Sequence, residues 1–184
     1  SEEIFRGLHI PNPDFNLEVG SGPPGAQTGQ ILIRIEPILQ KLKPDWVLVY
    51  GDTNSTLAAA LAAAKMGLKT AHVEAGLRSW NREMPEELNR VLTDHASDLL
   101  LAPTELAMAH LQAEGLNERS HLVGDVMADL LENCRQGLDP TSIRESLGLD
   151  GEYFVSTVHR PSNTDDPEQL TSLVRAMAGL ASPV

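Results

Sequence analysis

Cysteine is almost absent from this sequence, since Cys134 is the only one in 184 residues. One cysteine cannot form an intrachain disulfide or supply a cysteine-based metal cluster. The histidines His95, His110 and His121 do not share metal-ligand spacing with one another or with nearby acids, so we predict no metal site. The low cysteine content is typical of cytosolic proteins, and we expect a cytoplasmic protein.

Long apolar runs are also missing. The longest strongly apolar run covers residues 57–64 and ends at Lys65, which is far short of the roughly 20 residues that a membrane span needs. The N-terminal residues carry acids early and lack the basic and then apolar layout of a signal peptide. We therefore expect no membrane association.

Positive charge is scarce. The chain has 14 Lys and Arg against 26 Asp and Glu, a formal net charge of -12. Such a surface repels phosphate backbones and anionic lipids, so nucleic acid is not an expected partner. An anionic small ligand is still compatible with this charge, because a helix N-terminus or a single arginine creates a local positive site.

Several nucleotide-binding and catalytic motifs are missing as well. The sequence contains no Gly-rich dinucleotide fingerprint, no P-loop and no nucleophile elbow. The Gly-rich stretch at residues 20–25 lacks the helix-opening spacing of a phosphate cradle. These absences leave the substrate unnamed by the residues alone.

What the sequence does contain is an alternation of apolar runs and amphipathic segments. Glycine and proline are dense at residues 20–25, so residues 1–30 are predicted to form a loop. Isoleucines and leucines then recur at steps of three and four, which predicts a helix over residues 28–43 that Pro44 ends. A continuous apolar run predicts a strand over residues 46–50 that is covered on both faces.

The same alternation continues to the end of the sequence, and it predicts an α/β fold with parallel sheets. After the turn at residues 51–55, Asn54 or Ser55 is expected to cap an Ala-rich helix that runs through Met66. Further strands are predicted over residues 69–73, 99–102, 121–123 and 153–158, and further helices over 85–95, 104–114, 125–135, 142–147 and 167–178.

The stretch around residues 136–140 reads as a connector between two domains. We predict that residues 1–136 form most of an N-terminal Rossmann-like domain and that residues 137–184 begin a second one. The second part holds a single βα unit, which cannot bury its own apolar face. We therefore expect the fold to be incomplete at its C-terminal end.

Polar side chains follow three of the predicted strands. Asp52 follows the strand at 46–50, Glu74 follows the next strand, and His159 follows the strand at 153–158; Glu86 opens the helix after the Glu74 loop. In open α/β sheets ligands bind at the carboxyl ends of the strands. Carboxylates and a histidine at such an edge suit proton transfer and stabilisation of a leaving group.

Each of these residues also has a structural interpretation. Asp52 could cap the next helix, and Glu86 could complement the dipole of the helix it opens. Glu74 follows a buried run and needs a partner or a task, and an ion pair with Arg78 would supply the partner. His159 could simply end a strand at the surface. His72, inside an apolar strand, is expected to be a satisfied core histidine.

Five segments, in order, resemble motifs of the non-hydrolysing UDP-N-acetylglucosamine 2-epimerases. They are residues 47–56 (VLVYGDTNST), 72–78 (HVEAGLR), 84–90 (MPEELNR), 124–127 (GDVM) and 157–160 (TVHR). The resemblance covers nearly the whole chain. It implies a glycosyltransferase-B-like fold, with two Rossmann-type domains of which this sequence is incomplete at both ends.

The resemblance also implies a reaction and its residues. The family interconverts UDP-N-acetylglucosamine and UDP-N-acetylmannosamine by eliminating UDP and adding it back, without nicotinamide or metal. Asp52, Glu74 and Glu86 match its catalytic carboxylates, and His159 matches a histidine near the departing UDP. Arg78 and Arg160 are the expected substrate-binding residues, and the family's common state implies a homodimer.

The sequence also departs from the family pattern. It lacks the family's N-terminal strand with its Gly-Thr-Arg-Pro-Glu loop, and it lacks the later Ser-Asp-Ser-Gly-Gly segment. Ser162 stands where many relatives carry a glutamate. We therefore expect the 184-residue polypeptide by itself to be inactive.

Other functions are compatible with the same motifs. The Asn54-Ser55 form of the first motif also occurs in relatives that act on UDP-sugars modified at C3 and C6, such as UDP-2,3-diacetamido-glucuronic acid. A retaining glycosyltransferase of the same fold would release UDP only with an acceptor. A non-catalytic nucleotide-sugar-binding module would bind the ligand without loss of the C2 proton.

Overall fold

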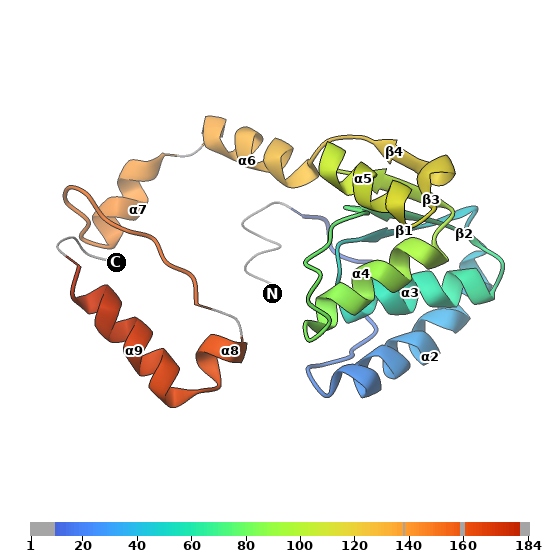
Figure 1. The fold of residues 1–184 in the computed structure, drawn as a ribbon, viewed down its shortest axis with the longest axis horizontal. Helices are drawn as coiled ribbons and strands as arrows, with labels where there is room; N and C mark the ends of the chain where they lie inside the picture. The colour runs from blue at the N-terminus through green and yellow to red at the C-terminus, as the bar shows by residue number, and fades with distance from the viewer. Residues whose placement is uncertain (1–9, 138, 159–160, 181–184) are drawn as a thin grey trace. The chain divides into compact units, whose positions relative to one another are not determined.

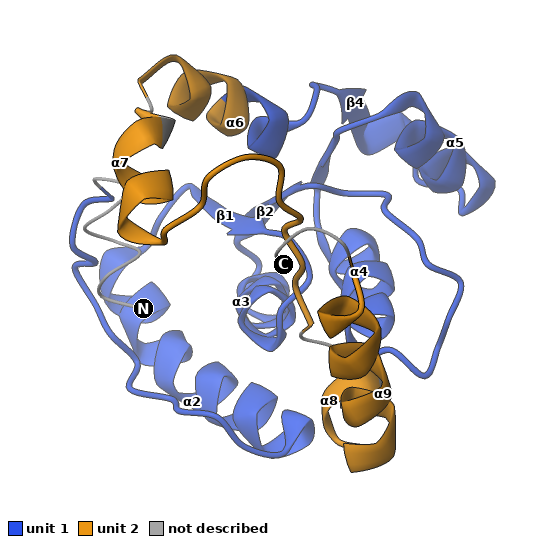
Figure 2. Ribbon diagram, turned by 90° about the vertical axis from the view of Figure 1, so that its left-hand side faces the viewer, with its two compact units in different colours: residues 1–129 blue, residues 130–184 orange. Residues whose placement is uncertain are grey.

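The computed structural model describes residues 10–137, 139–158 and 161–180. The chain forms two compact units, Ser1–Asp129 and Leu130–Val184 (Figure 2).

The first unit is built on a parallel sheet of four strands (Figure 1). The strands lie in the order of the sequence, with Tyr50 opposite Val73, His72 opposite Leu100, and Leu101 opposite His121. The alternation of strands and helices predicted this α/β class correctly. The strands are β1 (Trp46–Tyr50), β2 (Lys69–Val73), β3 (Leu99–Ala102) and β4 (Ser120–Leu122).

Helices connect these strands. They are α2 (Pro24–Leu42), α3 (Asn54–Lys65), α4 (Pro85–Ala96), α5 (Glu105–Ala113), the short 3-10 helix η1 (Asn117–Arg119), and α6 (Val126–Gly137), which runs from the first unit into the second. The predicted helices over 85–95, 104–114 and 125–135 are confirmed to within two residues at each end.

Two apolar clusters hold the helices against the sheet. Val47 and Val49 of β1 pack with Leu39 of α2 and with alanines of α3, and Leu100 of β3 belongs to a second cluster with Leu111 of α5. Because Val49 lies opposite His72, and His72 lies opposite Leu100, both clusters lie on the same face of the sheet.

The other face of β1 differs from the prediction. Trp46, Leu48 and Tyr50 alternate with the buried valines and are 45%, 49% and 59% exposed. A strand order that follows the sequence, with right-handed crossovers, places the connecting helices on one face. The expectation that this strand is covered on both faces is therefore wrong for the described residues.

Two local predictions also need correction. Helix α2 begins at Pro24, four residues before its predicted start, because proline is well accommodated in the first turn of a helix. The cap of α3 is Thr53, whose side chain accepts a hydrogen bond from the backbone N–H of Thr56. Asn54 and Ser55, the predicted caps, instead lie in the first helical turn.

The second unit contains α7 (Pro140–Ser146), α8 (Pro161–Thr164) and α9 (Pro167–Ala178). The last of these confirms the predicted helix over 167–178, and the side chain of Asp166 caps it. The predicted strand over residues 153–158 is wrong, since this segment is irregular and Val155 is 82% exposed. Within the part of the chain that the structure describes, no helix is long and apolar enough to cross a membrane.

Candidate active site

The carboxyl ends of β1 and β2 bring Asp52 and Glu74 to the same edge of the sheet. Tyr50 and Val73 are opposite one another, and the backbone N–H of Gly51 donates to the carbonyl of Val73 at 3.1 Å. A Cβ added to Gly51 would lie 3.5 Å from the Glu74 Oε2 atom. The carboxylate of Glu74 therefore lies against the turn that carries Asp52.

The backbone of Glu74 is in the left-handed region, with φ at 69°. A side chain with a Cβ rarely adopts this conformation, and such residues often mark functional sites. The neighbouring N–H of Ala75 donates to the carbonyl of Leu101 at 3.2 Å and anchors the turn to the next strand. The sheet thus holds Glu74 in a strained, half-buried position.

Asp52 is held by Arg90 of α4. The Nη2 and Nε atoms of Arg90 donate to Asp52 Oδ2 at 2.6 and 2.9 Å, and the Asp52 side chain stays 30% exposed. Asp52 does not cap α3, because Thr53 does. The structural alternative considered for Asp52 is therefore wrong.

Glu86 is exposed in the first turn of α4. It lies four residues before Arg90, so the two share one side of the helix. This places Glu86 one helical turn from the residue that contacts Asp52. Its position also suits an acid that complements the helix dipole.

His159 and Arg160 lie outside the described residues. Their predicted roles remain predictions.

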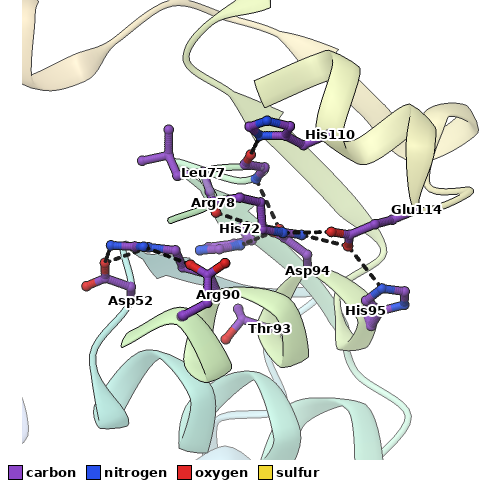
Figure 3. A network of polar contacts seen from close by, with 12 residues as sticks. Asp52, His72, Leu77, Arg78, Arg90, Thr93, Asp94, His95, His110 and Glu114 are labelled. Atoms are coloured by element: carbon purple, nitrogen blue, oxygen red, sulfur yellow. Dashed lines mark hydrogen bonds and ion pairs between the residues drawn. The ribbon is translucent and has the colours of Figure 1, made fainter. Parts of the chain in front are cut away.

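Arg78 is buried in a network of its own (Figure 3). Its Nε and Nη2 atoms each donate to a different oxygen of Glu114 at 2.7 Å, and Nη1 lies 2.8 Å from Asp94 Oδ2. Its side chain is 0% exposed. The ion pair with Glu74 that we considered is therefore wrong, because Arg78 pairs with these two carboxylates instead.

The same network includes His72, which the sequence correctly predicts to be a satisfied core histidine (Figure 3). Its side chain is 0% exposed, Nδ1 lies 2.6 Å from Asp94 Oδ1, and Nε2 lies 2.8 Å from the carbonyl of Gly51. A carbonyl only accepts, so Nε2 donates. His72 therefore fixes the backbone of the turn that carries Asp52.

Glu87, beside the predicted Glu86, organises the loop before α4. Its carboxylate is 4% exposed and accepts from the N–H and hydroxyl of Ser79, both at 2.8 Å, and from the N–H of Trp80 at 2.9 Å. Burial alone would raise the pKa of Glu87, but these hydrogen bonds and one from Arg90 lower it below its ordinary value. Glu87 is therefore an anion that holds this loop.

The inward-facing side of α4 is polar, which the sequence did not predict. The buried residues of this helix are Glu87, Asn89, Thr93 and Asp94, while Leu88 and Leu92 are 46% and 44% exposed. Polar residues that recur at helical spacing usually indicate a solvated side. In α4 the signal for a buried polar side was the pair Leu88 and Leu92, because these leucines lie four residues apart and form a separate apolar side of the helix.

The described residues contain no group of three or more His, Cys, Asp or Glu side chains that could hold a metal ion.

Comparison with known proteins gives a consistent result. A family model described as UDP-N-acetylglucosamine 2-epimerase matches residues 1–183. A protein named as a UDP-N-acetylglucosamine 2-epimerase homolog from Methanococcus maripaludis is 51% identical over 176 residues, which are 94% of this chain and 49% of that protein. A UDP-2,3-diacetamido-2,3-dideoxy-D-glucuronate 2-epimerase from Pseudomonas aeruginosa is 47% identical over 96% of this chain and 50% of its own length.

Solved structures agree with the sequence relatives. The crystal structure of Methanocaldococcus jannaschii UDP-GlcNAc 2-epimerase in complex with UDP-GlcNAc and UDP matches with a TM-score of 0.87 and 45% identity. The match covers 97% of this chain and 50% of that one. The chain is thus α/β with a glycosyltransferase-B-like fold, and it spans about half the length of the relatives it matches.

Proposed function

Because this chain belongs to the UDP-N-acetylglucosamine 2-epimerase family, we propose that the complete protein inverts C2 of a UDP-sugar. The proposed reaction interconverts UDP-N-acetylglucosamine and UDP-N-acetylmannosamine. The observation that carries this proposal is the placement of Asp52 and Glu74 at the carboxyl ends of adjacent parallel strands.

The reaction needs acid and base groups at C2 and a stabilised leaving group. In the first half, a base removes the C2 proton, the C1–O bond breaks, and UDP departs with the bonding electrons, which leaves a glycal-type double bond between C1 and C2. In the second half, UDP adds back to C1 while an acid delivers a proton to the opposite face of C2. Carboxylates suit both proton transfers.

We assign the proton transfers to Asp52, Glu74 and Glu86. Two of these carboxylates lie at one sheet edge, and the third stands one helical turn from Arg90, the partner of Asp52. Their different environments support separate roles, since Glu74 is half-buried and Glu86 is exposed. We assign stabilisation of the charge on the departing UDP to His159 and Arg160.

For Arg78 we propose an effect on substrate binding through the loop that it holds. Its guanidinium is fully buried, and direct contact with a ligand would require it to leave Asp94 and Glu114. It also donates to the carbonyl of Leu77. These contacts support an indirect contribution.

A second candidate substrate is a UDP-sugar modified at C3 and C6. The Pseudomonas aeruginosa relative supports it at 47% identity. Asn54 does not decide between the sugars, because both ends of its side chain are used inside the protein. Its Nδ2 donates to Gln27 Oε1 at 2.8 Å, and its Oδ1 accepts from Asn89 at 3.1 Å.

We further propose that the complete protein is a cytoplasmic homodimer. Leu88 and Leu92, exposed on α4, support burial of this helix against another surface. Light scattering on the purified complete protein tests the assembly, and a monomeric mass at micromolar concentration would reject it.

The experiment that tests the function uses the complete gene product that contains these 184 residues. It is incubated with UDP-N-acetylglucosamine in heavy water, and the C2 proton is followed by NMR. Loss of this signal with formation of the manno epimer is expected. An unchanged signal would reject this substrate, and the diacetamido-glucuronate sugar would then be tested in the same way.

The remaining alternatives give different results in the same assay. UDP release that depends on an added acceptor would identify a glycosyltransferase. Binding of UDP-sugars with no exchange at C2 would identify a binding module.

A further inference from the structure

We propose that Arg90 is a positioning residue that orients the carboxylate of Asp52 for the reaction at C2, an inference that rests on the proposed function. Two donors of Arg90 converge on one oxygen of Asp52, at 2.6 and 2.9 Å from Oδ2. Among the described residues, Oδ1 receives no hydrogen bond. One oxygen is thus fixed while the other stays available in a side chain that is 30% exposed.

Arg90 is itself held in place. Its Nη1 atom donates to Glu87 Oε2 at 3.1 Å, and its side chain is only 17% exposed. Glu87 is in turn fixed by the backbone N–H groups of Ser79 and Trp80. The planar guanidinium therefore reaches Asp52 from a fixed direction, which a flexible lysine cannot reproduce.

The backbone of the Asp52 turn is fixed independently of Arg90. Asn89 Nδ2 donates to the carbonyl of Asp52 at 2.8 Å, and His72 Nε2 donates to the carbonyl of Gly51 at 2.8 Å. Removing Arg90 therefore leaves the turn in place and releases the Asp52 side chain. It also removes the Arg90 bond to Glu87, but Glu87 keeps its three hydrogen bonds from Ser79 and Trp80. This separation distinguishes a role in orientation from a role in folding.

Loss of orientation affects the chemical step more than binding. A displacement of a reacting group by about 1 Å can lower a rate about 100-fold. Binding of the UDP moiety does not depend on the Asp52 carboxylate in this proposal. A variant that loses only orientation thus lowers kcat and leaves the Kd for UDP unchanged.

The test compares variants of the complete gene product. In Arg90→Met, kcat for C2 proton exchange is expected to fall about 100-fold, while the Kd for UDP and the midpoint of thermal unfolding stay close to wild type. Arg90→Lys keeps the charge and loses the two-donor fork, so its kcat is expected to lie between that of wild type and that of Arg90→Met. Arg135→Met is the matched control. The Arg135 side chain is 80% exposed in a surface ion pair, and this variant is expected to leave kcat unchanged.

Several outcomes would overturn the inference. An unchanged kcat in Arg90→Met shows that Asp52 needs no partner. A rise in the Kd for UDP as large as the fall in kcat shows that Arg90 acts on the ligand. A large drop in the midpoint of thermal unfolding, with a proportional loss of UDP binding, shows a structural role. Should Arg90→Met fail to fold, Arg90→Gln is measured by the same criteria.

The proposed function and this inference fail in different ways. Wild-type protein that shows no C2 exchange with any UDP-sugar rejects the function and the inference with it. Active wild-type protein with an equally active Arg90→Met variant rejects the inference alone.

Discussion

Arg78 shows how this protein tolerates a fully buried positive charge. Taking a guanidinium out of water costs several kcal/mol unless carboxylates and hydrogen bonds compensate. Here Asp94 and Glu114 both contact it, and Glu114 does so with two parallel hydrogen bonds. Burial would lower the pKa of Arg78, but these two carboxylates raise it above its ordinary value. The charge is therefore kept, and it joins α4 to α5 through the loop after β2.

Glu114 carries a pH dependence that follows from this network. The hydrogen bond from Arg78 lowers the pKa of Glu114 below its ordinary 4.5, burial opposes this, and His95 lowers it further. In the unfolded chain Glu114 takes up a proton near pH 4.5, while the folded protein resists protonation until lower pH. The unfolded state therefore binds more protons in this range, and stability falls as the pH drops through the lowered pKa.

We predict that Glu114→Gln lowers the free energy of unfolding most above pH 4.5, and that its difference from wild type shrinks as the pH falls below this value. Urea unfolding of the complete gene product at a series of pH values measures this. Glu132→Gln, in a surface pair that is 61% exposed on the glutamate side, is the control with a small difference at every pH. A difference for Glu114→Gln that stays constant with pH contradicts the prediction.

At this scale the sequence predicts some site residues and misses others. Asp52 and Glu74 were predictable because the ends of parallel strands meet at one edge. Arg90 was not, because it lies 38 residues from Asp52 in the sequence. Asp94 was missed for the same reason, since it is 22 residues from His72. Such pairs depend on how α4 packs against the sheet, which residue spacing does not determine.

At the scale of elements, α4 is the helix on which the site depends. Its inward side carries polar groups that bind three separate segments: Asn89 and Arg90 hold the Asp52 turn, Glu87 holds the loop at Ser79, and Asp94 holds Gly76. An apolar side would pack equally well but would leave these backbone groups without partners. Because the inward side of α4 is occupied by the polar groups that orient these loops, the leucines of α4 face outward.

The loop after β2 also packs closely against α5, at Gly76. This residue has φ at 82°, and a Cβ added there would lie 2.5 Å from the carbonyl oxygen of Ala107 and 2.9 Å from Leu111 Cγ. We predict that Gly76→Ala lowers the free energy of unfolding by about 2–4 kcal/mol, from left-handed strain together with overpacking. Chemical unfolding of the complete gene product measures the change.

Gly67 provides the matched control for that substitution. Its φ is 70°, but a Cβ there would meet nothing within 4 Å. Gly67→Ala therefore tests the strain alone and is expected to cost about 1 kcal/mol. Equal losses in the two variants would show that close packing against α5 contributes nothing.

Element boundaries show where local sequence signals suffice and where they do not. The helix over 85–95 was predictable because proline and acids mark its start. The start of α2 was missed because the two prolines and three glycines at residues 20–25 indicate a loop as well as a helix start. The exposed face of β1 was missed because an apolar run reports burial but not the order of the strands in the sheet.

At the scale of the whole molecule, the two units differ in the secondary structure that their described residues form. The first unit has a four-stranded sheet with two apolar clusters. In the second unit the described residues include the C-terminal part of α6, the helices α7, α8 and α9, and an irregular segment at 152–158. The apolar, β-branched sequence of that segment predicted a strand, and its absence has a physical reason, because a strand needs a partner for its backbone hydrogen bonds.

The relatives are about twice as long as this chain, and we predict that residues 153–158 form a paired strand in the complete gene product. Tyr153, Phe154 and Val155 are 40%, 53% and 82% exposed here, and pairing with further strands would bury them and protect their amides. Hydrogen exchange followed by mass spectrometry measures this, with slow exchange expected in the complete protein and fast exchange in the 184-residue polypeptide. Residues 69–73 of β2 are the control, since this strand is paired on both sides and should exchange slowly in both. Equally fast exchange of residues 153–158 in the complete protein would contradict the prediction, and His159 would then follow an irregular segment and not a strand end.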